Sequence, residues 1–432
     1  MNEEILSFVW RFGYYESINL CTDEGASLSV LRTGFKNRNA GPDFCDARIR
    51  TDGVDWVGCI EIHVKSSDWY QHHHETDPAY ESVVLHVVWE NDQPVLRSNG
   101  SKIPTLSLKG LVKLSVIERY HQLIHEEDEI PCSKSFGLVS DLQKFSMLDR
   151  VLLERLDKKA EQVLMLLETN QQDWEVTAYQ WLTQHFGFKL NDHAFSRLSR
   201  IVPLKVIQKH RNNILQIEAI LYGTAGLIPE NTEEDLTSAD YLYLEELRRE
   251  YKFLSTKYRL QNEQMKPHEW KFLRLRPAGF PTVRLAQLAV LLSKSNGLFS
   301  SLTSPKKIAT LHELLNLEQS VYWQKHFQFG KKAKSKVPVM GKEAINMLII
   351  NAAVPLIVAF SRNRQQPELL ERAIGWLSEI PAENNRIIRA WEKLEMKVKT
   401  AGDSQALIEW FNNYCSDKKC LNCIVGSALV RS

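Results

Sequence analysis

The spacing of hydrophobic and polar residues changes character near residue 110. Before that point, short apolar runs alternate with turn residues, as in a domain that combines strands with a few helices. The Asp-Gly pair in Thr51-Asp52-Gly53 is typical of a tight hairpin turn between two strands. The pattern predicts a helix over residues 3–12 and strands over residues 27–31, 44–50, 56–65, 83–89 and 95–97. We therefore expect a mixed α/β domain over residues 1–111.

Beyond residue 112, apolar residues recur at three- and four-residue spacing, which is the period of amphipathic helices. Helices are predicted over residues 142–168, 174–185, 206–222, 238–258, 282–293, 342–361, 368–377, 385–396 and 404–414. No fixed repeat length links these segments, so a regular solenoid is not supported. The sequence thus predicts an α+β protein in which a large, irregular, all-helical domain over residues 112–432 follows the α/β domain.

Candidate chemistry is concentrated in the strand predicted over residues 56–65. Side chains alternate between the two faces of a strand, so the isoleucines share one face, and Glu61, His63 and Lys65 share the other. Three titratable groups so close together shift one another's pKa values and are able to share a metal ion or a substrate. The same stripe is also compatible with the solvated face of an edge strand.

Asp43 follows a Gly-Pro turn, at the point where the chain enters the preceding strand. If the Asp-Gly turn closes a hairpin, these two strands are adjacent. Counting residue pairs outward from the turn puts Asp43 opposite roughly Ile62, from which it approaches Glu61 and His63. We therefore predict a site formed by Asp43, Glu61, His63 and Lys65.

A Pro-Asp pair, followed on the next strand by an acidic residue and a lysine, resembles the PD-(D/E)xK nuclease superfamily. The resemblance covers roughly residues 3–90 and implies a restriction-endonuclease-like fold. It implies that Asp43 and Glu61 hold Mg²⁺ or Mn²⁺, hard cations that suit carboxylate oxygens, and that Lys65 activates the attacking water. Glu4 in the first helix would correspond to an additional acid that some members carry.

The sequence departs from that pattern at one position. The family places an acid two residues before the lysine, and here His63 occupies that position, while Glu61 lies two residues earlier on the same face. His63 is therefore a candidate for either a metal ligand or a general base.

A histidine-rich segment follows the strand. Three consecutive histidines, His72 to His74, are suited to a transition metal and equally to a hydrated loop. His86 lies within an apolar strand and is more typical of a buried, hydrogen-bonded histidine. Trp69 and Tyr70 would either stack on a nucleic-acid base or close the edge of the sheet.

The chain has seven cysteines, and this odd number argues against a disulfide framework. Three of them, Cys415, Cys420 and Cys423, have the spacing C-x4-C-x2-C, which suits Zn²⁺ or a [4Fe–4S] cluster. Cys132 is the candidate fourth ligand. Some PD-(D/E)xK nucleases combine one distant cysteine with a cluster of three to bind [4Fe–4S]. This chain has a similar set of one plus three cysteines, but the spacing differs, and the lone cysteine follows the nuclease-like region instead of preceding it. Reduced cysteines in a terminal helix and turn are the alternative.

Composition limits the partners only weakly. The chain carries 54 basic and 53 acidic residues, for a net charge of +1, so contact with nucleic acid would require a local patch. Two basic segments, residues 271–284 and 331–336, suit phosphate groups or simply a solvated surface. The acidic start of the chain is unlike a signal peptide, and we identified no run of about 18 uncharged apolar residues. We expect a cytoplasmic protein without a membrane span.

Three segments together resemble an uncharacterised bacterial family classed as a domain of unknown function. They are the segment ending in Pro42-Asp43, the strand at Glu61 with the residues that follow it, and the terminal cysteine segment. The resemblance appears along the whole chain and implies no established activity. Our leading hypothesis is a metal-dependent nuclease acting on DNA or RNA. The alternatives are a non-catalytic nucleic-acid-binding or scaffold protein, and a zinc hydrolase that uses His63 with the histidine triplet.

Overall fold

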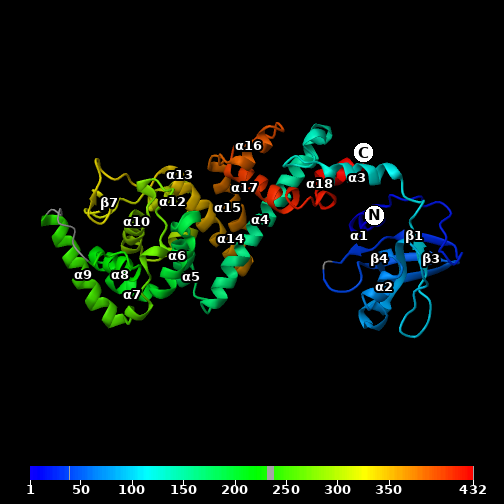
Figure 1. Cartoon of the computed structure of the whole chain (residues 1–432), viewed down its shortest axis with the longest axis horizontal. Helices are drawn as coiled ribbons and strands as arrows, with labels where there is room; N and C mark the ends of the chain where they lie inside the picture. The colour runs from blue at the N-terminus through cyan, green and yellow to red at the C-terminus, as the bar shows by residue number, and fades with distance from the viewer. Residues whose placement is uncertain (38, 231–237, 432) are drawn as a thin grey trace. The chain divides into compact units, whose positions relative to one another are not determined.

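The computed structural model describes residues 1–37, 39–230 and 238–431 of the chain. It has an N-terminal curled sheet of mixed strands followed by a mostly helical region, so the α+β class expected from the sequence is confirmed at this level (Figure 1). The chain divides into two compact units. Unit 1 comprises Met1–Arg150, Arg389–Met396 and Leu407–Ser432, and unit 2 comprises Val151–Ile388 and Lys397–Ala406.

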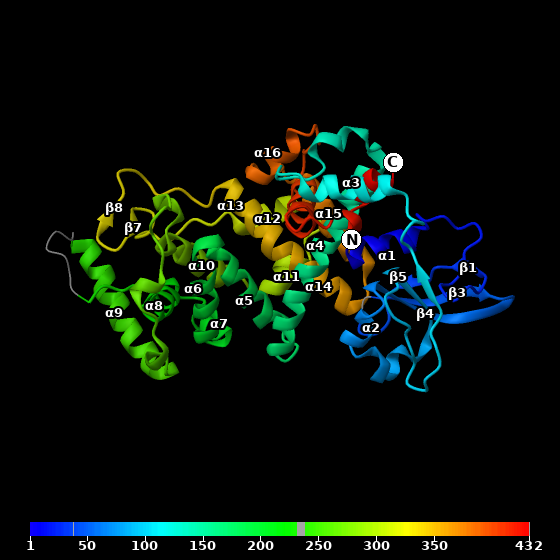
Figure 2. The ribbon, with the colours of Figure 1, turned by 45° about the vertical axis from the view of Figure 1, so that its right-hand side comes forward.

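The six-stranded sheet of unit 1 combines two kinds of strand pairing. Its order is β1-β3-β4-β5-β6, and β2 pairs with β3 beside β1. The pairs β1–β3, β2–β3 and β3–β4 are antiparallel, whereas β4–β5 and β5–β6 are parallel. The strands are β1 (Leu28–Arg32), β2 (Phe35–Lys36), β3 (Phe44–Thr51), β4 (Val54–Lys65), β5 (Val83–Glu90) and β6 (Thr105–Ser107). The central strand is thus β4, which carries the candidate residues (Figure 2).

The predicted hairpin between β3 and β4 is present. Thr51 pairs with Val54, and the two turn residues, Asp52 and Gly53, both have positive φ, as a type I′ hairpin turn requires. The pairing then shifts by one residue at a bulge between Phe44 and Ala47, so that Phe44 pairs with Ile60.

Helix α1 (Glu3–Phe12) begins at an Asn2 cap and ends at Gly13 in the left-handed region, where a glycine is favoured. Its apolar side chains, including Ile5, Val9 and Trp10, are fully buried, and the helix packs on β4. One side of the central strand is therefore covered by α1.

The crossover from β4 to β5 consists of α2 (Asp68–Gln71) and the short 3-10 helices η1 (His74–Thr76) and η2 (Pro78–Ser82). Trp69 anchors this segment, because its side chain is 1% exposed and packs with Val83, Val95 and Ile103. Of the two roles considered for Trp69, closing the sheet is the one consistent with this burial. The crossover places the histidine-rich segment against β4.

The rest of unit 1 is helical. Helix α18 packs against α3, as Figures 1 and 2 show, and the Arg119 guanidinium Nε–H donates to the Val430 carbonyl. The elements are α3 (Leu114–His125), η3 (Ser133–Leu138), the start of α4 (Asp141–Thr169), part of α16 (Arg386–Glu392) and of α17 (Ala401–Trp410), η8 (Phe411–Cys415), η9 (Cys420–Asn422) and α18 (Ile424–Arg431).

Unit 2 contains the remaining helices around one large apolar core. They are α5 (Trp174–Phe186), α6 (Phe188–Ile201), α7 (Leu204–His210), α8 (Ile214–Thr224), α9 (Ser238–Tyr258), η4 (Gln261–Glu263), η5 (Pro267–Glu269), η6 (Pro277–Gly279), α10 (Pro281–Lys294), α11 (Leu298–Thr303), α12 (Ile308–Leu315), α13 (Lys342–Leu348), η7 (Ile349–Ala353), α14 (Val354–Arg364) and α15 (Pro367–Glu379), together with a small hairpin of β7 (His326–Gln328) and β8 (Lys331–Lys332).

Several sequence predictions need correction. Residues 95–97 form no strand and contribute only an isolated bridge from Leu96 to Lys102, whereas the last strand of the sheet is β6. The helix predicted over residues 206–222 is interrupted between His210 and Ile214, where Asn213 caps the start of α8. Helix α6 was not predicted at all.

The helix predicted over residues 342–361 is longer and more apolar than expected, which corrects the expectation that the chain has no long apolar run. Residues 342–364 form 23 continuous helical residues that are long and apolar enough to cross a membrane, judged by length and composition alone. In the structure, 72% of the most apolar window of this stretch is buried within the protein. A core helix of a folded unit has the same properties.

Candidate metal centre

Glu61 and His63 lie on the central strand, and both side chains are buried. The exposed fractions are 6% for Glu61 and 1% for His63. The reason is that β4 has neighbouring strands on both edges and contacts both α1 and α2. The stripe is therefore not the solvated face of an edge strand, which was the alternative interpretation of the sequence.

Asp43 and Glu61 are held together by two reciprocal hydrogen bonds. The Asp43 backbone N–H donates to Glu61 Oε2 at 3.0 Å, and the Ile62 backbone N–H donates to Asp43 Oδ2 at 3.2 Å. The one-residue shift at the bulge makes this possible, because it aligns Asp43 with Glu61 rather than with Ile62. Burial, with a further contribution from Asp43, raises the pKa of Glu61 to about 9. Burial also raises the pKa of Asp43, although the hydrogen bond from the Ile62 backbone and the charge of Lys36 both lower it.

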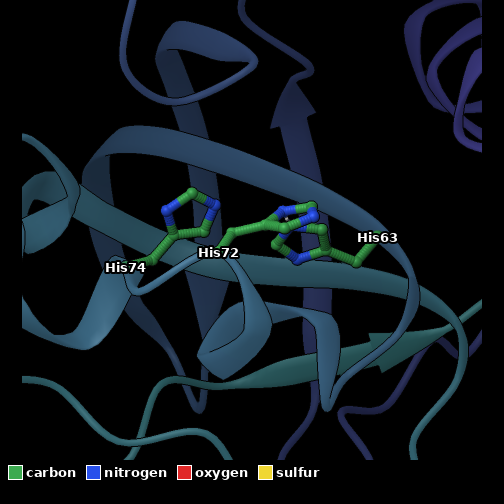
Figure 3. A group of neighbouring side chains, drawn as sticks. All are labelled: His63, His72 and His74. Carbon is green, nitrogen blue, oxygen red and sulfur yellow. Dashed lines mark hydrogen bonds between the residues drawn. The ribbon is translucent and has the colours of Figure 1, made fainter.

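Three histidines gather beside these carboxylates. One ring nitrogen from each of His63, His72 and His74 lies within 4.8 Å of the other two. His63 Nε2 is 3.1 Å from His72 Nδ1, and Figure 3 shows these two rings side by side with His74 next to them. Glu61 Oε1 lies 3.6 Å from His63 Nε2 and 3.5 Å from His74 Nε2.

These separations match the edges of a metal coordination polyhedron. With zinc–nitrogen distances of about 2.0–2.1 Å, two ligands of a tetrahedral zinc are about 3.3–3.4 Å apart. The distances from Glu61 to two of the histidines, and between His63 and His72, lie within 0.3 Å of that value. Three imidazoles and one carboxylate are also a donor set that zinc accepts. The three histidines are therefore grouped closely enough to share one ion, and Glu61 is spaced as a fellow ligand of His63 and His74.

The surrounding residues orient the ligands. His63 Nδ1 lies 2.8 Å from Nε2 of His86, which is fully buried. Tyr80 stacks on His74 with the ring centroids 3.7 Å apart. Burial and the neighbouring histidines lower the pKa of His63 to about 2, and burial lowers that of His86 to about 3. Both imidazoles are thus neutral at neutral pH, as metal binding requires.

Not every predicted residue joins this centre. Lys65 is exposed at the end of β4, and its backbone N–H donates to Asp68 Oδ2. Glu4 bonds instead to the Asn422 side chain, at 3.2 Å. The acid of α1 that interacts with the site is Glu3, whose pKa is raised by burial and also responds to the charges of His72 and Asp43. Sequence reasoning missed Glu3, because the pattern does not fix the rotation of α1.

The middle histidine of the triplet behaves differently from its neighbours. His73 adopts a positive φ at the start of η1 and is exposed. The left-handed turn at His73 brings His72 and His74 to the same side, towards β4. Two members of the triplet therefore belong to the metal centre, and the third does not.

The other candidate residues are not members of the histidine group. Arg284 of unit 2 is mostly buried above the Phe188 ring, and burial lowers its pKa to about 10, so it does not present a phosphate-binding surface. In the second basic segment, Lys336 pairs with Glu318. The four predicted cysteine ligands, Cys132, Cys415, Cys420 and Cys423, are all buried within unit 1, and none forms a disulfide.

The fold and the site together define a protein with a mixed sheet whose central strand carries a carboxylate–histidine cluster. Residues 3–386 match the family described as protein of unknown function (DUF2851), and the chain belongs to that family. The family resemblance inferred from the sequence is therefore confirmed. No curated protein and no solved structure was found to be similar.

Proposed function

We propose that the protein is a metal-dependent phosphodiesterase that cleaves nucleic acid, with its active centre at Glu61, His63, His72 and His74. The observation that carries the proposal is the grouping of three histidine nitrogens within 4.8 Å of one another, with Glu61 Oε1 at 3.5–3.6 Å from two of them. Asp43 and Glu61 lie on adjacent strands, as the resemblance to PD-(D/E)xK nucleases implies. The histidines favour zinc as the ion, because imidazole suits zinc better than it suits magnesium.

The proposed chemistry is hydrolysis of a phosphodiester. A bound divalent cation would polarise the phosphate and lower the pKa of a bound water. Asp43, which is hydrogen-bonded to Glu61 through its backbone, would accept a proton from the attacking water. The ester oxygen then leaves and takes a proton from solvent.

The case for nucleic acid as the substrate comes from the exposed face of the neighbouring strands. Lys36 is close enough to Asp43 for its charge to lower the pKa of that carboxyl. Arg32 lies over the exposed Phe35 ring, 5.5 Å from its centroid, and pairs in register with Arg48. Arg48 is already paired with Asp55 at 2.7 Å, so we expect a bound phosphate to contact Lys36 and Arg32 instead. Basic and aromatic groups together suit phosphates and unstacked bases.

The experiment is a cleavage assay of the full chain on single- and double-stranded DNA and RNA with Zn²⁺, Mn²⁺ or Mg²⁺. We expect metal-dependent cleavage of at least one substrate, and a loss of about 100-fold or more for Asp43→Asn. His73→Ala should cleave like wild type. A wild-type chain inactive on all four substrates, or an Asp43→Asn variant that cleaves as well as wild type, would overturn the proposal.

A second function is favoured by the burial of the centre. Glu61 and His63 are almost completely enclosed, and structural zinc sites are closed, whereas catalytic sites keep a position open to water. On this interpretation the ion stabilises a non-catalytic nucleic-acid-binding protein. Binding of DNA or RNA without cleavage, together with a lower melting temperature after zinc removal, would favour this alternative.

A further inference from the structure

The four buried cysteines of unit 1 come from two segments that are far apart in the sequence. Cys132 immediately precedes η3, Cys415 ends η8, Cys420 begins η9, and Cys423 immediately precedes α18. Their exposed fractions are 5–7%. Each of them therefore lies at the end of a short helical element, and the fold shields all four from solvent.

The four thiols lie within electrostatic reach of one another. Burial raises the pKa of Cys415, and the charges of Cys132, Cys423 and Cys420 raise it further. The pKa of Cys132 is raised by burial and then by Cys423 and Cys420. The elements that carry these cysteines also pack together, because α18 contacts both η3 and η9, and η8 contacts η9. The geometry therefore brings the four cysteines into one part of unit 1.

The backbone around the C-terminal cysteines is held by a tight turn and by a close approach to α18. Lys418 has a positive φ, and its N–H donates to the Cys415 carbonyl at 3.1 Å. A Cβ on Gly426 would clash with the Cys420 backbone, so α18 starts directly against that residue. Burial raises the pKa of Cys423, whereas hydrogen bonds from the Gly426 backbone, the Trp410 indole and the Val425 backbone act in the opposite direction. N–H groups directed at sulfur stabilise a thiolate.

Two cations compensate the charge that bound thiolates would bring. The charge of Arg150 lowers the pKa of Cys423, and that of Lys418 lowers the pKa of Cys420. Both cations are anchored within unit 1. Arg150 donates to the Tyr414 hydroxyl at 2.9 Å, and Lys418 Nζ donates to the carbonyls of Ile124 and Glu126.

The spacing of the sulfur atoms separates two possible occupants. Four thiolates on one zinc ion would be about 3.8 Å apart, given zinc–sulfur distances of about 2.3 Å. Among the residues that the structure describes, the ligand atoms that gather within 4.8 Å of one another are those of His63, His72 and His74, and the cysteine sulfurs form no such group. In a [4Fe–4S] cluster each thiolate binds a different iron, so the four sulfurs stand further apart.

We propose that Cys132, Cys415, Cys420 and Cys423 bind a [4Fe–4S] cluster that ties the segment after the sheet to the C-terminal helices. This centre is separate from the histidine centre and does not depend on the proposed function. Its role is structural, because it joins two distant segments of one compact unit.

The test is metal analysis of the full chain purified without oxygen. We expect about four iron and four acid-labile sulfide per chain, with broad visible absorption that is lost on reduction. Cys420→Ser should lose this iron and sulfide, whereas Cys21→Ser, which changes an exposed cysteine, should keep both.

Two results would overturn the cluster. One is a zinc ion that Cys420→Ser removes and His72→Ala leaves in place. The other is wild-type protein that takes up no iron and no sulfide after anaerobic reconstitution with both. If Cys420→Ser does not fold, the iron and sulfide content of wild type and the electron paramagnetic resonance spectrum of its reduced form decide the question.

Discussion

His63 Nδ1 lies 2.8 Å from His86 Nε2, so one histidine of the candidate centre is positioned by another that does not reach the centre itself. This contact fixes the orientation of the His63 ring and leaves its Nε2 directed at His72 and Glu61. Metal-binding histidines commonly have such a partner on the second nitrogen, and losing the partner lowers metal affinity 10–100-fold.

We predict that His86→Leu weakens zinc binding by about 10–100-fold while the protein remains folded. A competition titration against a chelator of known affinity measures this. His326→Leu is the matched control, since His326 is also buried, with Nδ1 2.9 Å from a backbone carbonyl, but lies in unit 2. Equal zinc affinity in the wild type and His86→Leu would show that His86 does not orient His63.

A buried acid in unit 2 makes stability depend on pH. Burial raises the pKa of Glu218 from near 4.5 to about 7, although a 2.9 Å hydrogen bond from the Tyr243 hydroxyl lowers it. Because the folded state holds the proton more tightly than the unfolded state does, the protonated acid stabilises the fold below about pH 4.5. This contribution is lost as the pH rises through 7.

We predict that the free energy of unfolding of the wild type falls by roughly 3 kcal/mol more than that of Glu218→Gln between pH 4.5 and 8. Urea denaturation at several pH values measures the difference. Parallel pH profiles for the two proteins would mean that Glu218 does not titrate with a raised pKa.

Gly58 of β4 lies against the start of the next strand. A Cβ at this position would meet the Val84 side chain and lie 2.5 Å from the Ser82 carbonyl oxygen. We predict that Gly58→Ala destabilises the protein by about 1–3 kcal/mol, measured by denaturant unfolding. Gly137→Ala should change stability by less than about 0.5 kcal/mol, since its Cβ would meet nothing within 4 Å. A Gly58→Ala variant as stable as Gly137→Ala would contradict the close approach.

Local signals predicted much of the fold around the site. The Asp-Gly turn fixed the β3–β4 hairpin, and alternation along β4 placed Glu61 and His63 on one face. The prediction that Asp43 approaches Glu61 depended only on these two features. Helix α1, which has strong apolar periodicity, agrees with its predicted range, and so does helix α9.

Other parts of the site depend on long-range structure that the pattern does not contain. The bulge before Ala47 shifts the register by one residue, and no local signal announces it. The parallel pairing of β4 with β5 brings His86 to His63, and a left-handed turn at His73 separates the triplet. The sequence therefore offered the histidines as candidates without showing which of them converge.

The most direct test of the account is the zinc content of two neighbouring variants, His72→Ala and His73→Ala. Both residues are exposed, so neither change should unfold the protein, but only His72 reaches His63. The account predicts that His72→Ala holds one zinc per chain fewer than His73→Ala, or binds it at least tenfold more weakly. Equal zinc content and equal affinity in the two variants, or no zinc in either, would contradict a metal centre at Glu61, His63, His72 and His74.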